Sequence, residues 1–214
     1  MKMAYYENGK PVPLAVMRSI YEDVWLKLQA TSRSCLLDVG GGVGLFSQTF
    51  QSRVKIVVTA DISPAMIQDA HRLNPQGWFS LCEVTSLPFS KESFDRILCY
   101  SVFHYLSSLS HARKALDEFM RVLKKNGLIL IGDVLYPQEL LKQKFKENLS
   151  KPQGKTPTAP WWPSLLTHHL KKKTFNPEFF KKYCQRNGYR CKILAQDIEG
   201  KLTSSSRYDV ILRF

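Results

Sequence analysis

Features that define several large classes of proteins are missing from this 214-residue sequence. It has no apolar run near the roughly 18 residues that a membrane span needs, and its first residues, MKMAYYENGKPVP, lack the apolar core of a signal peptide. Its five cysteines are an odd number with no CxxC spacing, which indicates reduced thiols and neither a disulfide framework nor a zinc site. We therefore expect a cytoplasmic protein without a bound metal.

Negative charge is scarce in the last third of the chain. The formal net charge is +13 at pH 7, and residues 138–214 contain 16 Lys and Arg against 6 Asp and Glu. Hydrophobic residues make up 44% of the sequence, which is typical of a folded globular protein and excludes a disordered chain. The charge asymmetry predicts an anionic partner or substrate for the basic end.

Apolar runs and helical patterns alternate along the chain as far as residue 136. The runs with the length and composition of buried strands are 34–39, 55–60, 78–84, 94–101 and 127–136. The segments with helix signals are 14–29, 45–51, 63–73 and 110–123, with Ser63 as an N-cap, Pro64 at the first helical position and Gly127 as a C-cap. This alternation indicates a parallel sheet with helices on both faces. Two further strands, 189–198 and 207–214, are expected to form an antiparallel hairpin.

The segment DVGGGVG, residues 38–44, places four glycines directly after the first predicted strand. Glycine is costly to order, so such a cluster indicates that the backbone lies close to something. Ligands of open α/β sheets bind here, beyond the carboxyl ends of the strands. The spacing of Gly40, Gly42 and Gly44 is GxGxG rather than GxGxxG, and no Lys-Ser or Lys-Thr follows. Neither a dinucleotide fingerprint nor a P-loop is therefore matched.

Acidic residues stand at the ends of the first three predicted strands. Asp38 precedes the glycines, where a carboxylate suits a cationic ligand amine. Asp61 follows Gly40 by 21 residues, at the place from which an acid pairs with two ribose hydroxyls. Glu83 suits an exocyclic amino group. Together these positions favour a ribose-containing ligand.

Four motifs in this order resemble those of class I S-adenosylmethionine-dependent methyltransferases, in the small-molecule branch that includes ubiquinone- and menaquinone-type methylases. The motifs are LLDVGGGVG, ADISPAMI, EVTSLPFSKESFDRILCYSVFHYL and RVLKKNGLILIGDV, and they cover residues 33–136. The resemblance implies an α/β fold with a Rossmann-like seven-stranded sheet, mostly parallel with an antiparallel C-terminal strand and with helices on both faces. It also implies S-adenosyl-L-methionine as the cofactor and methyl transfer as the reaction.

The resemblance implies which residues face the methionine end of the cofactor. Gly40 and Gly42 would approach the methionine part, and Asp38 would lie near its amino group. Ser101, just after the fourth predicted strand, falls where the methionine end and the substrate meet.

It likewise implies the residues at the nucleoside end. Asp61 would hold the ribose, and Ile62 belongs to the same set of cofactor-binding residues. Glu83 and Val84 occupy the positions that contact adenine. The family usually has Asp where this chain has Glu83, which is one methylene longer.

Methyl transfer from a sulfonium is an in-line displacement with a good leaving group, so the protein mainly aligns the nucleophile and excludes water. A general base is needed only when the nucleophile carries a proton that it does not shed alone. His104, in SVFHYL beyond the fourth predicted strand, is the candidate base. The alternative is that His104 only packs at the start of the next helix.

Residues 137–187 follow the fifth predicted strand, where this fold commonly has a cap over the acceptor pocket. Trp161 and Trp162 stand between prolines, a pattern that favours a rigid aromatic wall. They either contact the acceptor or anchor the cap itself. His168 either faces the acceptor from the cap or lies on the surface.

We expect one methyltransferase domain over residues 1–214. Tyr5 and Tyr6, ahead of the first helix, either fold over the cofactor and substrate or pack against the body of the domain. The expected segments are an N-terminal helix and lid at 1–32, a cofactor-binding core at 33–136, a basic, Trp-containing substrate cap at 137–187, and a C-terminal hairpin at 188–214.

Three functions remain open at this point. The first is methyl transfer to a small, anionic or amphipathic metabolite, with peripheral membrane contact through the basic helix pattern in LLKQKFKENL. The second is methylation of a nucleic acid such as RNA, because aromatics between lysines suit stacking and phosphate contacts. The third is a non-catalytic partner subunit that binds the cofactor. The sequence does not indicate an oligomeric state.

Overall fold

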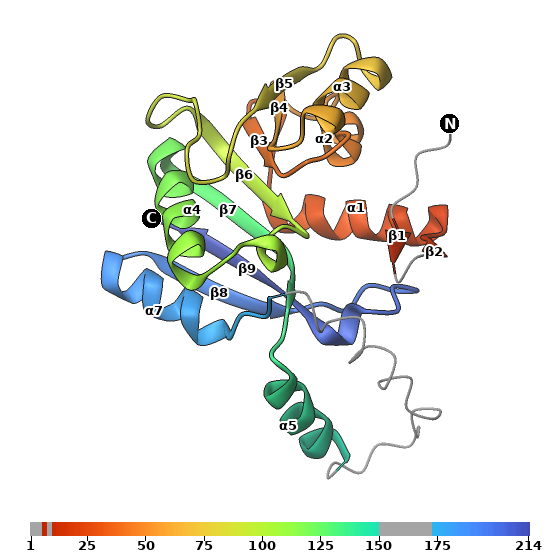
Figure 1. Ribbon diagram of the computed structural model, residues 1–214, viewed down its shortest axis with the longest axis vertical. Helices are drawn as coiled ribbons and strands as arrows, with labels where there is room; N and C mark the ends of the chain where they lie inside the picture. The colour runs from red at the N-terminus through yellow and green to blue at the C-terminus, as the bar shows by residue number, and fades with distance from the viewer. Residues whose placement is uncertain (1–5, 8–9, 150–172) are drawn as a thin grey trace.

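Seven strands form one sheet in the computed structural model, which describes residues 6–7, 10–149 and 173–214 (Figure 1). The strands are β3 (Cys35–Val39), β4 (Ile56–Asp61), β5 (Trp78–Leu81), β6 (Phe94–Tyr100), β7 (Leu123–Leu135), β8 (Arg190–Ala195) and β9 (Arg207–Arg213). Their order across the sheet is β5-β4-β3-β6-β7-β9-β8. Neighbours pair in parallel except at β9, which is antiparallel to both β7 and β8. The predicted fold class is thereby confirmed, including the reversed C-terminal strand.

Helices cover both faces of this sheet. They are α1 (Leu14–Leu28) and α2 (Leu45–Phe50) over one face, and α4 (Leu109–Val122) and α7 (Pro177–Asn187) over the other. Side chains alternate along each strand between the two faces. In β6, Ile97 and Cys99 belong to the apolar cluster with α4 and α7, whereas Leu98 and Tyr100 belong to the cluster with α1 and α2. Both faces of a central strand are therefore apolar, as a doubly covered parallel sheet requires.

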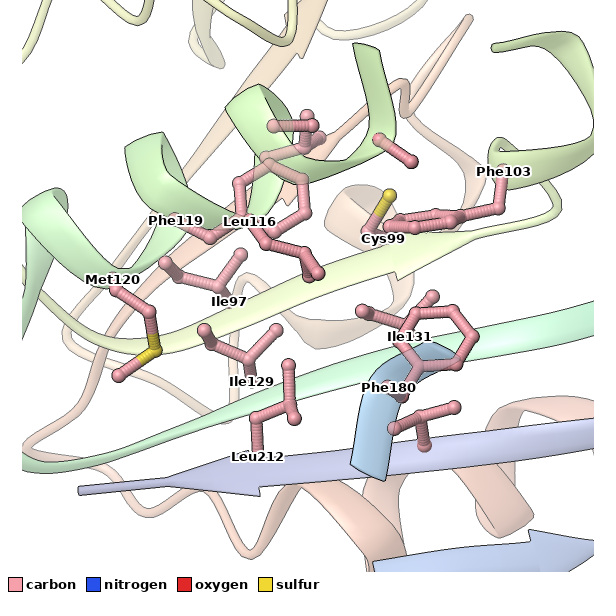
Figure 2. Close-up of a cluster of buried hydrophobic side chains, with 14 of the residues drawn as sticks. Ile97, Cys99, Phe103, Leu116, Phe119, Met120, Ile129, Ile131, Phe180 and Leu212 are labelled. Atoms are coloured by element: carbon pink, nitrogen blue, oxygen red, sulfur yellow. The ribbon is translucent and has the colours of Figure 1, made fainter. Parts of the chain in front are cut away.

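The cluster under α4 is the larger of the two (Figure 2). Leu116 and Phe119 of α4 lie over the strands that carry Ile97 and Ile129, and Phe180 reaches the same cluster from α7 (Figure 2). All five side chains are fully buried. Burying one such side chain contributes about 1.5–3 kcal/mol, so this packing holds the C-terminal segment against the core built by the first half of the chain.

Two helix starts follow the expected capping chemistry. Ser63 precedes α3 (Pro64–Leu73) and its Oγ accepts from the backbone N–H of Met66 at 3.4 Å, with Pro64 in the first turn. Both features confirm the sequence prediction. Ser108 caps α4 in the same way, because its Oγ accepts from His111 N at 3.0 Å.

Two sequence predictions about element ends are wrong. Gly127 does not cap α4: the helix ends at Val122, and the chain passes directly into β7 through extended Leu123. The left-handed residue there is Asn126, with φ 66°, and Gly127 is needed because a Cβ on it would lie 2.6 Å from the Leu123 side chain. Strand β5 ends at Leu81, so residues 83 and 84 lie in the following loop.

The remaining elements are short or peripheral. They are β1 (Tyr6–Glu7) and β2 (Lys10–Pro11), which pair with each other, the 3₁₀ turns η1 (Phe103–Tyr105) and η2 (Ser204–Ser206), and α5 (Gln138–Leu149). Helix α5 leads away from the sheet at the bottom of Figure 1. The described part of the chain contains no helix both long and apolar enough to cross a membrane, and no group of three or more His, Cys, Asp and Glu that could hold a metal ion.

Candidate cofactor and acceptor site

The glycine loop lies beyond the carboxyl end of β3 and adopts the left-handed backbone that favours glycine. Gly40, Gly42 and Gly44 have φ of 68°, 56° and 79°. Space is short as well: a Cβ on Gly40 would lie 2.3 Å from Val102 Cγ2, and one on Gly41 would lie 2.6 Å from Asp38 Oδ2. The loop therefore needs glycine both for its conformation and for its close contact with neighbouring residues.

Asp38 lies beneath this loop rather than on its surface. Its side chain is 1% exposed, and Oδ2 accepts from Ser47 Oγ at 2.9 Å. Ser47 in turn accepts from Thr59 Oγ1 at 2.6 Å. Burial raises the pKa of Asp38 to about 7, the nearby Asp61 carboxylate raises it as well, and the Ser47 hydrogen bond acts in the opposite direction. A cation placed at the loop would favour the ionised form of Asp38.

Asp61 closes β4 and binds the backbone on both of its oxygens. Oδ2 accepts from Gly42 N and Oδ1 from Ser63 N, each at 2.9 Å. Each carboxylate oxygen retains capacity for a second donor, such as a hydroxyl. The next residue, Ile62, is 68% exposed, an apolar side chain at the same edge of the sheet. Asp61 thus ties the glycine loop to the start of α3 and keeps acceptor capacity for a diol.

Glu83 and Val84 follow β5 and turn toward α4. Glu83 Oε1 lies 3.0 Å from Nε2 of His111, and Nδ1 of His111 lies 2.9 Å from Ser107 Oγ. Val84 packs against the larger apolar cluster. The sequence analysis missed His111, although its position one turn into a Ser-capped helix places it beside the loop after β5.

Ser101 follows β6 with a strained backbone, and its side chain points to a buried acid. Its φ is 62°, and its Oγ donates to Asp133 Oδ2 at 2.6 Å. Asp133 also has φ 62° and sits where the β7–β9 register shifts. Such bulges re-aim side chains near functional sites. Two cations bind its carboxylate, Lys201 Nζ at 2.5 Å and Arg207 Nη1 at 3.0 Å.

These charges decide the ionisation of Asp133. Burial by itself would raise the pKa of this carboxyl, but Lys201 and Arg207 hold the pKa well below its usual range. A second buried acid, Asp209, continues the network: it accepts from Asp133 N at 2.9 Å and from Lys27 Nζ at 2.7 Å. Lys201 also donates to Gln196 Oε1 at 2.7 Å. We call these residues, together with Ser101, the ion network.

The ion network was not found from the sequence. The available signal was a lone acid inside an apolar run, as in LIGDVL around Asp133 and YDVIL around Asp209. Charged residues are almost never fully buried unless they are paired. Each of these acids therefore implies a cationic partner, but the spacing of residues along the chain does not identify which one.

His104, the candidate base, is buried in η1 beyond the carboxyl end of β6. Its ring centroid lies 4.2 Å from that of Tyr105, which is 72% exposed, and its carbonyl accepts from Lys173 N at 3.1 Å. Its role as a base stays a prediction. The side chains of Tyr5 and Tyr6, and Trp161, Trp162 and His168, lie outside the described residues.

Comparisons with known proteins agree on one domain type. Residues 37–131 match the family model described as a methyltransferase domain. The demethylmenaquinone methyltransferase of Renibacterium salmoninarum is 30% identical over 48% of this chain and 42% of its own length. The ubiquinone/menaquinone biosynthesis C-methyltransferase UbiE of Bordetella parapertussis is 33% identical over 45% of this chain and 39% of its own length. The chain thus spans less than half of these relatives.

The match to solved structures extends further along the chain. The crystal structure of the YcgJ protein from Bacillus subtilis superposes with a TM-score of 0.64, covering 85% of this chain and 72% of that one. At 22% identity, this likeness concerns the fold.

Proposed function

We propose that this protein, whose residues 37–131 match a methyltransferase domain, transfers a methyl group from S-adenosylmethionine to a small, anionic or amphipathic metabolite by in-line displacement. The observation that carries this proposal is the sheet edge at β3 and β4. There a left-handed glycine loop is tied by its own N–H group to Asp61, which keeps acceptor capacity for a ribose. The residues present fit the cofactor that this domain class uses.

The proposed binding roles follow from this geometry. Gly40 and Gly42 let the backbone approach the methionine part, and Asp38 supplies a buried negative charge beneath its ammonium group. Ser101 lies at the methionine end. A charge in a low-dielectric site acts over a longer range than one in water, so Asp38 acts without direct contact.

The nucleoside end is proposed to lie over β4 and β5. Asp61 accepts from the two ribose hydroxyls, and the exposed side chain of Ile62 provides an apolar surface for the base. Glu83 and Val84 border the base on the other side. Glu83 must leave or share its contact with His111 to accept from an amino group.

The acceptor is proposed to meet the methyl group beside Ser101 and His104. The cofactor supplies the sulfonium leaving group when bound, so the chain has to align the nucleophile, exclude water and, for a phenolic or hydroxyl acceptor, take up its proton at His104. Two relatives are named as menaquinone or ubiquinone methyltransferases, which supports a quinone-type, amphipathic acceptor. In this proposal, Trp161, Trp162 and His168 of the cap and Tyr5 and Tyr6 of the N-terminal segment contact the substrate.

The proposal also covers the domain organisation and the cellular location of the protein. The chain functions as a single domain in the four segments predicted from the sequence, and it works in the cytoplasm. All five cysteines are free, which suits a reducing compartment.

The test of the cofactor site is calorimetric titration with S-adenosylmethionine and S-adenosylhomocysteine. We expect Asp61→Ala to weaken binding by about 1–3 kcal/mol, since it removes the acceptor of both ribose hydroxyls. Asp69→Ala, an exposed acid on α3 paired only with Arg72 in the described structure, is the matched control and should bind as the wild type does. Equal affinity of Asp61→Ala and wild type would refute the ribose assignment.

The acceptor is then identified with methyl-labelled cofactor. A panel of naphthoquinols, catechols, aromatic carboxylates and RNA separates the acceptor classes. Label on a small amphipathic or anionic compound is the expected result. Label on RNA alone would replace this proposal with nucleic-acid methylation, and cofactor binding without label on any compound would favour a non-catalytic subunit.

A further inference from the structure

Two residues on neighbouring strands, one directly after β6 and one inside β7, have a left-handed backbone that residues other than glycine seldom adopt. Ser101 after β6 and Asp133 in β7 are both non-glycine residues with φ 62°, and their side chains are hydrogen-bonded to each other at 2.6 Å. A left-handed backbone at such residues costs free energy and persists only where the surroundings over-determine it. The paired strain therefore calls for a structural cause.

The cause lies in the C-terminal third. Lys201, just ahead of η2, and Arg207, the first residue of β9, both donate to the Asp133 carboxylate, and all three side chains are at least nine-tenths buried. The backbone N–H of Asp133 is bound as well, by Asp209 Oδ1 at 2.9 Å. Asp133 thus has little freedom to move.

The opposite end of this chain of contacts is the glycine loop. Ser101 N donates to the carbonyl of Gly132 at 3.0 Å, so backbone and side chain both attach Ser101 to β7. The next residue, Val102, fills the space beside Gly40 so closely that a Cβ on Gly40 would lie 2.3 Å from Val102 Cγ2. A displacement of Ser101 would move Val102 and release Gly40.

We propose that Asp133, clamped by Lys201 and Arg207, is a positioning residue that holds Ser101 and Val102 against Gly40 and so sets the shape of the cofactor site. Asp133 itself does not touch the cofactor. The inference rests on the proposed placement of the methionine end at the glycine loop. It assigns to the basic C-terminal third a role in shaping the cofactor site.

The test compares Asp133→Asn and Ser101→Gly with the control Asp95→Asn. Asn removes the charge that the two cations bind, and Gly removes the Ser101 hydroxyl while tolerating φ 62°. Asp95→Asn also removes a carboxylate that binds a lysine, Lys124 Nζ at 3.1 Å, but Asp95 lies near the start of β6, at the opposite end of that strand from Ser101. Each variant is measured for thermal unfolding, for the Kd of S-adenosylhomocysteine, and for amide exchange at Gly40–Gly42 without ligand.

We expect both test variants to bind about tenfold more weakly or worse and to exchange the loop amides faster. The control should lose thermal stability but keep both the Kd and the exchange rates. Asp133 is only structural if the test variants lose no more affinity than Asp95→Asn and the loop amides exchange as in the wild type. Should Asp133→Asn fail to fold, Ser101→Gly decides by the same two readouts.

The two proposals fail in different ways. If wild type binds neither S-adenosylmethionine nor S-adenosylhomocysteine, the placement of the cofactor is wrong, while faster loop exchange in Asp133→Asn would still support positioning. If wild type binds and the loop amides are indifferent to both variants, the positioning role is wrong and the cofactor site stands.

Discussion

The carboxyl edge of the sheet is built in two different ways. At β3 and β4 the candidate site is built mainly from backbone, with three left-handed glycines and the two N–H groups bound by Asp61. At β6 and β7 it consists of side chains, with Asp133 buried between Lys201 and Arg207. At β3 and β4 a Cβ added to Gly40 or Gly41 would clash with its neighbours, whereas at β6 and β7 the loss of a cation would leave the buried Asp133 carboxylate without part of its compensation.

The difference shows which kind of site can be identified in a sequence. A backbone site needs glycines next to one another, so its signature is local. A side-chain network is assembled from residues far apart along the chain, as Lys27, Asp133 and Arg207 are, and it becomes visible only when the fold brings them together.

The largest expected effect tests the ion network. Lys201→Met removes one of the two cations on Asp133 and leaves a fully buried carboxylate partly uncompensated. Breaking one side of a buried pair typically costs 3–5 kcal/mol, so we expect a loss of about that size in the free energy of unfolding. Urea denaturation measures it. A loss below about 1 kcal/mol would mean that Arg207 alone compensates Asp133, and the contrast between the two edges would disappear.

The two edges also predict opposite pH dependences. Asp38 has its pKa raised to about 7, so the folded protein binds an extra proton between about pH 4 and 7. The contribution of Asp38 to the free energy of unfolding is therefore fully present below about pH 4. It falls as the pH rises from about 4 through 7, by up to about 4 kcal/mol in total. Asp133 has a lowered pKa, so its contribution is present above about pH 4 and is lost as the pH falls below that value.

Urea unfolding of wild type and Asp38→Asn at pH 5 and pH 8 separates these contributions. Asp38→Asn should remove most of the decline between the two pH values. If the decline is the same in both proteins, Asp38 is not the group that titrates.

An intermediate effect tests the glycine loop. Gly40→Ala combines a left-handed φ of 68° with a contact of 2.3 Å to Val102, so we expect a loss of about 2–3 kcal/mol and of cofactor binding. Gly188→Ala is a matched control, because Gly188 has φ 73° but nothing within 4 Å of the added Cβ. It should lose only the conformational part, about 1–2 kcal/mol.

A double variant sharpens this result. Gly40→Ala with Val102→Ala removes the crowding but not the backbone cost, so cofactor binding should partly return. Equal losses for Gly40→Ala and Gly188→Ala would show that the contact with Val102 carries no weight.

Features that depend on neighbouring residues could be predicted from the sequence, and those that depend on tertiary contacts could not. The strand and helix alternation and the Ser63 cap were predicted correctly, because they depend on local periodicity and on capping chemistry. The reversed last strand was also predicted correctly, from the short connection between the last two strands and from the family resemblance. The Gly127 cap was predicted wrongly, since Gly127 is required by the Leu123 side chain that folds over it, a tertiary contact. At the site, spacing singled out Asp61, whose role toward a ribose stays a prediction, whereas the burial of Asp38 under Ser47 depends on how α2 packs.

The smallest expected effect concerns an exposed ion pair on α3. Its N–O distance is close to that of the buried Lys201–Asp133 pair, so a comparison of the two pairs measures what burial contributes. Arg72 Nη1 lies 2.8 Å from Asp69 Oδ1 on α3, close to the Lys201–Asp133 distance of 2.5 Å, but the two side chains are 64% and 43% exposed. Water screens such a pair and the side chains lose entropy on pairing, so Arg72→Ala should change the free energy of unfolding by about 0.5 kcal/mol or less. Urea denaturation of Arg72→Ala and Lys201→Met under the same conditions compares the two losses in the free energy of unfolding. If the two losses are nearly equal, distance alone determines how much each ion pair stabilises the fold. Burial of the ion network would then add nothing to how firmly it holds Ser101.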